Sequence, residues 1–282
     1  MTAQTKAMPW TPRKSCALLS TCVPIILAAA LIALAQEHVA RVVDLRGDWF
    51  LNSSQKLSAG MPLPASGIVQ VRNPKYGDYI AVANRSGKII ESRNCDNRCD
   101  EPINLPTTSS PSVFFRLFEA AMDLLSNGRE KWVVLISKGG ELREAVVKIE
   151  GKQVDLSTVL QDQHRGKYIL RFQPHRPGRT VNSKIVGPIT VDWNPSNLAP
   201  VVVKGLSPGL YMVQPLDNSG RKPLEPGSES LVLFATPETF DKAADAFHEA
   251  TELTNLWGDQ VQHGSKRQFL RAALGVIASE TQ

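Results

Sequence analysis

The chain has few of the residues from which metal and cofactor sites are commonly built. Its 282 residues include four cysteines and five histidines. No two histidines are separated by a single residue, and only Cys95 and Cys99 form a close cysteine pair outside an apolar run. Because a zinc site needs three or four such ligands at short spacings, the sequence predicts neither a metal site nor a small-molecule cofactor.

The chain also has little net charge once its first segment is set aside. Residues 1–35 hold three of the 32 basic residues and none of the 27 acidic ones, so the remainder has 29 basic and 27 acidic residues. A protein that binds nucleic acid through its phosphates needs a clear basic excess. The sequence therefore argues against a nucleic-acid partner.

Two segments resemble catalytic motifs, and each lacks an essential residue. Residues 205–209 read Gly-Leu-Ser-Pro-Gly, but Pro208 has no N–H to donate to an oxyanion, as the residue after a nucleophilic serine must. Residues 248–252 read His-Glu-Ala-Thr-Glu, so Glu252 replaces the second histidine of a zinc-binding helix. The sequence predicts no catalytic residue and no enzyme.

An uncharged apolar run at residues 15–35 follows Lys6, Arg13 and Lys14. This is the layout of an export signal, and the Ala-Leu-Ala ending at Ala35 places small residues where a signal peptidase cleaves. At about 1.5 Å per residue the run is also about 30 Å long, which is enough for a membrane anchor. Residues 1–35 are thus interpreted as a signal peptide or as an uncleaved anchor.

Either alternative places the rest of the chain outside the cytoplasm, because the positive residues precede the apolar run. We expect a protein that is anchored in a membrane or secreted to the periplasm or cell exterior. In such an oxidising compartment, Cys95 and Cys99 are expected to form a local disulfide.

Residues 36–106 are expected to form a small β-rich module. Short apolar runs separated by turn residues predict hairpins; they are Trp49–Leu51, Ile68–Val71, Tyr79–Val82 and Lys88–Ile90. The same segment contains Arg46-Gly47-Asp48, the tripeptide recognised by integrins, which we interpret as a chance occurrence within a strand leading into Trp49.

This module resembles the small β module of FecR-type bacterial envelope proteins. The resemblance rests on glycines and aliphatic residues over about 50 positions, namely Leu57, Gly60, Leu63, Pro64, Gly67, Ile68, Asp78, Ile80 and Gly87. It implies an extracytoplasmic module that contacts other proteins, with no catalytic residue to carry over.

A linker and a helix are expected over residues 107–130. Proline, threonine and serine dominate residues 104–112, which is typical of a linker. Ser110 as N-cap and Pro111 at the first position predict a helix that ends at Asn127-Gly128.

Residues 131–235 contain seven short apolar runs within about 100 residues, which predicts an immunoglobulin-like β-sandwich. No intersheet cysteine pair accompanies the runs, so an antibody-type domain is excluded. The segment 201–213 resembles a hairpin of such folds. The runs are Trp132–Ser137, Ala145–Ile149, Tyr168–Phe172, Ile189–Trp193, Val201–Lys204, Leu210–Val213 and Leu231–Phe234.

Residues 236–282 are expected to be helical. Thr236 and Pro237 begin one helix, and a capping box of Ser265 and Gln268 begins a second helix after a break at Gly258. The fold class is therefore mainly β with flanking helices (α+β), with a small N-terminal β module, an immunoglobulin-like sandwich and C-terminal helices.

One stretch of basic residues interleaved with aromatic residues stands out, at residues 164–184. It is either a solvated strand face or a surface that binds polyanions; its basic residues are Arg165, Lys167, Arg171, Arg176, Arg179 and Lys184.

Two functions remain for this sequence. The first is a non-enzymatic exported envelope protein whose β modules bind a protein partner or a cell-wall polymer. The second is an extracytoplasmic hydrolase of polysaccharide or peptide that uses carboxylates such as Glu141 or Asp192. The second requires two carboxylates that face each other about 5–9.5 Å apart in a groove.

Overall fold

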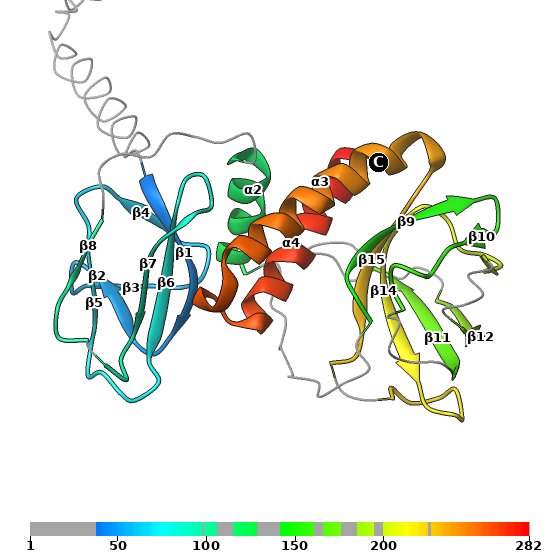
Figure 1. Cartoon of the computed structure of the whole chain (residues 1–282), viewed down its shortest axis with the longest axis horizontal. Coiled ribbons are helices and arrows are strands. Elements are labelled where there is room, and N and C mark those ends of the chain that lie inside the picture. Colours follow the sequence, from blue (N-terminus) through cyan, green and yellow to red (C-terminus); the bar gives the residue numbers. More distant parts are fainter. Residues whose placement is uncertain are drawn as a thin grey trace, which may run out of the picture. The chain divides into compact units, whose positions relative to one another are not determined.

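The computed structural model describes residues 38–97, 99–105, 115–128, 142–160, 166–175, 185–194, 200–224 and 227–281 (Figure 1). The predicted signal peptide or anchor, the expected helix start at Ser110 and the expected strand Trp132–Ser137 lie outside these residues. Within them, no helix is long and apolar enough to cross a membrane.

The first β-rich part consists of two four-stranded antiparallel sheets that share one apolar core around Trp49, Leu63 and Ile80. The first sheet has the order β4 (Pro62–Pro64), β1 (His38–Arg46), β6 (Tyr79–Asn84) and β7 (Ile89–Asn94). The second has the order β3 (Gln55–Lys56), β2 (Trp49–Leu51), β5 (Ile68–Val71) and β8 (Ile103–Asn104). The four expected runs correspond to β2, β5, β6 and β7.

The long strand β1 was not among the expected strands, because Arg41 and Asp44 interrupt its apolar pattern. Both residues are nevertheless buried, at 4% and 6% exposure. Arg41 donates from Nε to Glu119 at 2.7 Å and from Nη1 to the Gly60 carbonyl at 2.9 Å. Asp44 accepts the N–H of Gln262 at 3.1 Å. Partners distant in sequence thus allow both faces of β1 to be buried.

Arg46 is the last residue of β1, and Gly47 and Asp48 form an exposed bend between β1 and β2, so the assignment of the tripeptide to a strand was wrong for these two residues. Gly47 has φ +99°, and a Cβ there would lie 2.5 Å from Cγ of Asp78. Lys56 Nζ lies 2.6 Å from Asp48. The glycine is therefore explained by the backbone of the turn.

In the described residues, the second β-rich part is one sheet of seven strands. Its order is β12 (Val186–Trp193), β11 (Gly166–Pro174), β14 (Gly209–Leu216), β15 (Ser230–Ala235), β9 (Ala145–Glu150), β10 (Gln153–Val154) and β13 (Val201–Val202). All pairs are antiparallel except β15 with β9. Six of the seven expected runs are found as strands.

This sheet is a near-closed barrel around a single core. Val186 and Val191 of β12, at one end of the strand order, belong to the same apolar cluster as Val201 of β13 at the other end. A two-layered immunoglobulin-like sandwich is not confirmed by this arrangement. The hairpin expected over residues 201–213 was wrong, because β13 pairs with β10 while β14 pairs with β11 and β15.

Within the described residues, three α-helices accompany the sheets: α2 (Phe115–Ser126), α3 (Pro237–Leu256) and α4 (His263–Thr281). The expected end of α2 at Asn127-Gly128 is confirmed, with Gly128 at φ +62°. Helix α3 begins at Pro237 as expected, although the Thr236 side chain makes no capping bond. The expected capping box was wrong, since Ser265 lies within α4 and donates its N–H to the Gln262 carbonyl.

Helices α3 and α4 contribute side chains to two different apolar clusters. Trp257, which follows α3, and Phe269 of α4 pack with Ala81 and Ala83 of β6. Ala243 of α3 and Leu274 of α4 pack in a cluster that includes strands β9, β14 and β15. The C-terminal helices are therefore shared packing elements of both β-rich parts.

Candidate functional site

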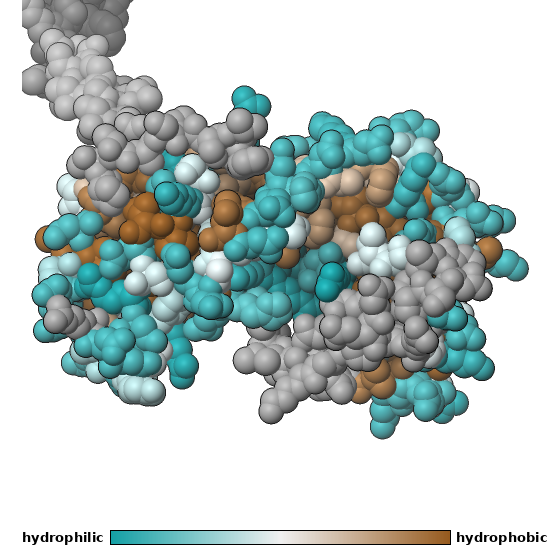
Figure 2. All heavy atoms as spheres, in the orientation of Figure 1, coloured by the Kyte–Doolittle hydropathy of each residue, from teal (hydrophilic) through white to brown (hydrophobic). Residues whose placement is uncertain are grey.

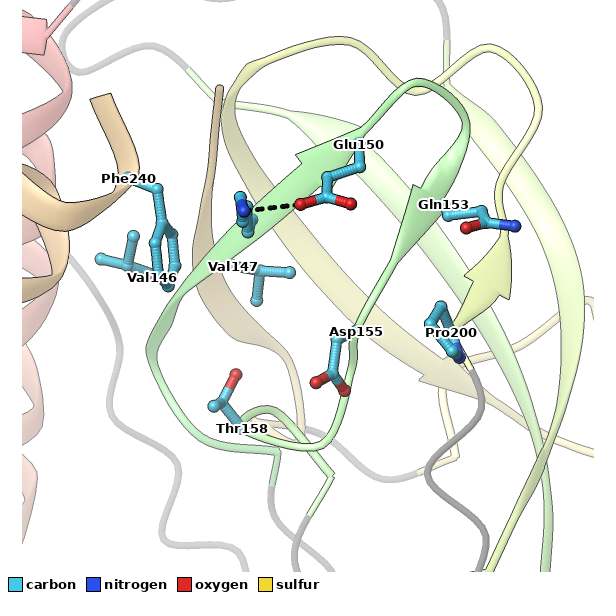
Figure 3. Close-up of a pocket in the computed structure, with 9 residues that line it drawn as sticks. Val146, Val147, Glu150, Gln153, Asp155, Thr158, Pro200 and Phe240 are labelled. Atoms are coloured by element: carbon cyan, nitrogen blue, oxygen red, sulfur yellow. Dashed lines mark ion pairs between the residues drawn. The ribbon is translucent and has the colours of Figure 1, made fainter. Parts of the chain in front are cut away.

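A hollow of about 360 Å³ lies beside strand β9 and the start of α3. In Figure 2, apolar residues gather in the region of β9, next to the hydrophilic residues of α3. The lining residues come from separate parts of the chain (Figure 3); they are Val146, Val147, Lys148, Glu150, Gln153, Asp155, Thr158, Pro200 and Phe240. Val146 and Val147 are buried, whereas Gln153, Asp155, Thr158 and Pro200 are exposed at the rim.

The hollow lies between β9 and the residues that follow β10, where these two parts of the chain separate. Strand β10 pairs with β9 only at Ile149 and Glu150, and the Arg143 N–H donates to the Val159 carbonyl at 3.0 Å on the other side of the gap. Between these points β9 pairs with β15 on one edge. On its other edge, no described residue pairs with the backbone of 145–148.

Carboxylates dominate the charge around the hollow. Lys148 Nζ lies 2.5 Å from Glu150, and this contact raises the pKa of Lys148, with smaller contributions from Asp241 and Glu238 at the start of α3. Asp155 accepts the Ser157 N–H at 2.9 Å and carries a further negative charge on the rim. One ammonium group thus lies among four carboxylates.

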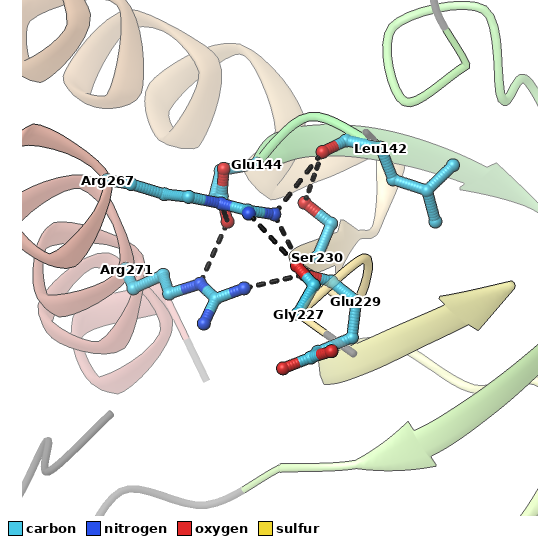
Figure 4. A network of polar contacts seen from close by, with 7 residues as sticks. All are labelled: Leu142, Glu144, Gly227, Glu229, Ser230, Arg267 and Arg271. Carbon is cyan, nitrogen blue, oxygen red and sulfur yellow. Dashed lines mark hydrogen bonds and ion pairs between the residues drawn. The ribbon is translucent and has the colours of Figure 1, made fainter. Parts of the chain in front are cut away.

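A second polar cluster joins α4 to the seven-stranded sheet (Figure 4). Glu144 accepts hydrogen bonds from Nε of both Arg267 and Arg271, each at 2.8 Å. Both arginines also donate to the Glu229 carbonyl. The three side chains are between 6% and 11% exposed, so the cluster fixes the helix to the sheet and presents little surface to a ligand.

The predicted polyanion-binding residues are only partly described. Arg165, Arg176, Arg179 and Lys184 lie outside the described residues. Lys167 and Arg171 lie on β11, where Lys167 is exposed and stands opposite Asp192 of β12. Arg171 donates to the Arg221 carbonyl at 3.2 Å. Polyanion binding by this cluster stays a prediction, and neither described member lines the hollow.

Cys95 and Cys99 lie at disulfide distance, with their Cα atoms 5.0 Å apart. The pair follows β7 and packs against the core around Trp49. It closes a turn and lines no part of the hollow. The contacts of the pair with the described residues are therefore those of a structural disulfide.

Replacing both cysteines with alanine should lower the free energy of unfolding by about 2 kcal/mol, because the closed ring restricts the unfolded chain. Urea unfolding of the oxidised protein and of the double variant measures this difference. A reducing agent should lower the stability of the natural chain and leave that of the double variant unchanged. Equal stabilities of the two proteins under oxidising conditions would contradict the prediction.

The segments that resembled catalytic motifs have no catalytic geometry. Residues 205–209 connect β13 to β14, so a strand follows Ser207 where a hydrolase elbow needs a helix. The Ser207 hydroxyl lies 3.2 Å from the Tyr211 hydroxyl. His248 is exposed on α3. In the part of the chain that the structure describes, no group of three or more His, Cys, Asp or Glu side chains could hold a metal ion.

Of the two carboxylates expected for a hydrolase, Asp192 does not line the hollow. Glu141 lies outside the described residues, and Asp192 is exposed on β12. Glu150 and Asp155 both line the hollow, but the Glu150 side chain is 61% exposed and bonded to Lys148. Asp155 is exposed as well. Neither carboxyl lies in the apolar enclosure that keeps a general acid protonated.

Comparison of the chain with protein-family models, with curated proteins and with solved structures finds no match. Any functional argument therefore depends on the sequence itself and on the chemistry of the described residues.

The sequence did not reveal the hollow, because its rim comes from β9, β10, the residue before β13 and the first turn of α3. The one local signal was an apolar run, Val146-Val147, that ends in the charged residues Lys148 and Glu150. That pattern predicts a strand but not the gap beside it.

Proposed function

We propose that the protein is exported and acts as a non-enzymatic envelope protein that binds a protein partner at the hollow beside β9. One observation carries this proposal: buried valines, the ring of Phe240 and an excess of carboxylates occur together at one concave place. Sites of 300–1,000 Å³ with an apolar floor and a few polar groups are typical of ligand binding.

The proposed location outside the cytoplasm rests on residues 15–35, with their basic flank and apolar run. If that run is not cleaved, it anchors the protein in a membrane. The disulfide distance between Cys95 and Cys99 supports an oxidising compartment.

The finer fold assignment is part of the same proposal. The antiparallel run β12–β11–β14–β15 supports a relationship of the second part to immunoglobulin-like sandwiches, which here close toward a barrel. The FecR-like assignment of the first part agrees with a module that contacts other proteins. Both interpretations favour binding over catalysis.

Tryptophan in place of Thr158 tests the proposal, because an indole at this exposed rim position fills the hollow without entering a core. The natural chain and the T158W variant are used to capture partners from an envelope extract of the source organism. We expect the natural chain to retain a protein that T158W loses.

The matched control is Ser54→Trp, which adds the same indole to an exposed turn after β2. It should capture the same partner as the natural chain. If T158W and S54W capture the same proteins equally well, the hollow is not the binding site. If a cell-wall polymer is the species lost from T158W, the partner class proposed here is wrong.

A further inference from the structure

We infer that the hollow receives one basic side chain of the protein partner, an arginine or a lysine, which enters from the solvent. Its aliphatic stem lies on the apolar floor and its charged head lies among the rim carboxylates. This inference rests on the proposed function and specifies the chemical group that is recognised. Three properties of the described residues lead to it: the enclosure of the hollow, its floor and its charge.

The enclosure of the hollow selects a compact group over a chain that runs through it. Strand β10 pairs with β9 at Ile149 and Glu150, and the Arg143 N–H donates to the Val159 carbonyl at 3.0 Å, so the chain closes the hollow at both ends. Residues 153–158 supply the wall opposite β9. A volume of about 360 Å³ is at the lower end of the range typical of ligand sites. A single side chain that projects from the surface of a partner fits such a space.

The floor of the hollow suits an aliphatic stem. Val146 and Val147 are 7% and 2% exposed, and the partly buried ring of Phe240 packs in the same cluster as Val146 (Figure 3). Arginine and lysine bury the methylene groups of their side chains along apolar surface and keep the charged head in water. A cationic head close to an aromatic ring also gains a cation–π contact. The floor therefore fits a long basic side chain.

The charge at the rim selects a cation. Lys148 Nζ lies 2.5 Å from Glu150, so its own positive charge is compensated. Glu238 and Asp241 at the start of α3 act electrostatically on Lys148 and so lie near the hollow. Together with Asp155 on the rim, they leave a local negative excess. Such a charge steers a cationic group to the site and excludes an anionic one.

An uncharged apolar side chain and a neutral sugar are the alternative occupants. An apolar side chain fits the floor but leaves the rim carboxylates without a partner group. A sugar offers hydroxyl groups to the carboxylates and a ring face to Phe240, but it leaves their negative charge uncompensated. We therefore assign the hollow to a basic side chain and make the other two occupants outcomes of the test.

The test uses the full chain and end-blocked pentapeptides in which one side chain is flanked by glycines. The arginine and lysine peptides are the expected ligands. The citrulline peptide is the matched control, because citrulline has nearly the shape of arginine without its charge. A leucine peptide and a chitin oligosaccharide represent the alternative occupants. Binding is followed by NMR at the methyl groups of Val146 and Val147 and at the amide of Thr158.

We expect saturable shifts of these signals with the arginine and lysine peptides at millimolar concentrations. A difference between these two peptides identifies the preferred cationic head. The citrulline peptide should bind at least about fivefold more weakly than the arginine peptide, because the cation–π and carboxylate contacts require the charge. Added salt should weaken binding of both basic peptides, because it screens the rim carboxylates.

One double variant and its control sharpen the assignment. Asp155→Asn combined with Glu150→Gln removes two rim charges, nearly keeps the shapes of the side chains and leaves Lys148 without its carboxylate. Affinity for the arginine peptide should therefore fall about fivefold. Glu252→Gln removes one exposed charge from the far end of α3 and should leave this affinity unchanged.

Binding of the citrulline peptide, the leucine peptide or the sugar as tightly as the arginine peptide would overturn the inference. So would equal affinity of the arginine peptide for the double variant and the natural chain, or failure of both basic peptides to bind. The T158W capture experiment separates the two levels. If T158W still loses a protein partner while neither basic peptide binds, the proposed function stands and the basic side chain is the wrong assignment. If the basic peptides bind at the hollow but T158W and S54W capture the same proteins, the proposed function fails.

Discussion

Replacing Glu144 with glutamine is expected to lower the free energy of unfolding by about 3–5 kcal/mol, one of the two largest effects that the structure implies. Glu144 is the carboxylate between the guanidinium groups of Arg267 and Arg271, and all three side chains are at least 89% buried. Removing one partner of a buried charge cluster leaves the opposite charge without compensation, which costs about 3–5 kcal/mol.

The glutamine keeps the size of the side chain, so the loss reports charge and not packing. Urea unfolding followed by circular dichroism measures it. The control is Glu150→Gln, which removes a carboxylate from an ion pair whose side chains are 41% and 61% exposed. That change should cost less than about 1 kcal/mol. If E144Q and E150Q lose similar amounts, the buried cluster does not stabilise the fold as described.

Alanine in place of Trp257 is expected to cost about 3–5 kcal/mol, because it removes a large buried side chain that links α3 to the first β-rich part. The indole is 1% exposed and lies edge-on to Phe269, with ring centroids 5.0 Å apart. Its Nε1 donates to the Gly87 carbonyl at 2.7 Å. Truncation therefore creates a cavity and leaves a buried carbonyl unpaired.

The neighbouring residue supplies the control. Leu256 is 79% exposed, so Leu256→Ala should change the free energy of unfolding by no more than about 0.5 kcal/mol. Trp257→Phe keeps an aromatic ring but loses the hydrogen bond, and its cost should fall between the two. Thermal and urea unfolding of the three variants give the comparison. Equal stability of W257A and L256A would show that the indole is not a packing anchor.

Local pattern predicted most of the elements, because strands and helices depend on spacing that the sequence displays directly. The runs at Trp49, Tyr79 and Leu231 became strands, and α2 ended at the expected Asn127-Gly128. These positions depend on residues within a few places of one another. Turn residues and apolar periodicity are sufficient signals there.

Elements that depend on distant partners were missed or misplaced. Strand β1 contains Arg41, whose burial requires Glu119 from α2. Strand β13 pairs with β10 and not with β14, which follows it in the chain. The hollow combines Asp155 with Phe240 of α3, and strands β11 to β15 lie between these two residues in the sequence. No local pattern contains such information, since register and long-range pairing are decided by the assembled core.

The most direct test of the account is amide hydrogen exchange in the presence of the protein partner that the natural chain captures and T158W loses. With the partner bound, amides around the hollow, in Ala145–Lys148 and at Thr158, should exchange more slowly, because the partner covers them. Amides of β14, which is paired on both edges, should not change. Unchanged exchange around the hollow while the partner is bound would contradict the account.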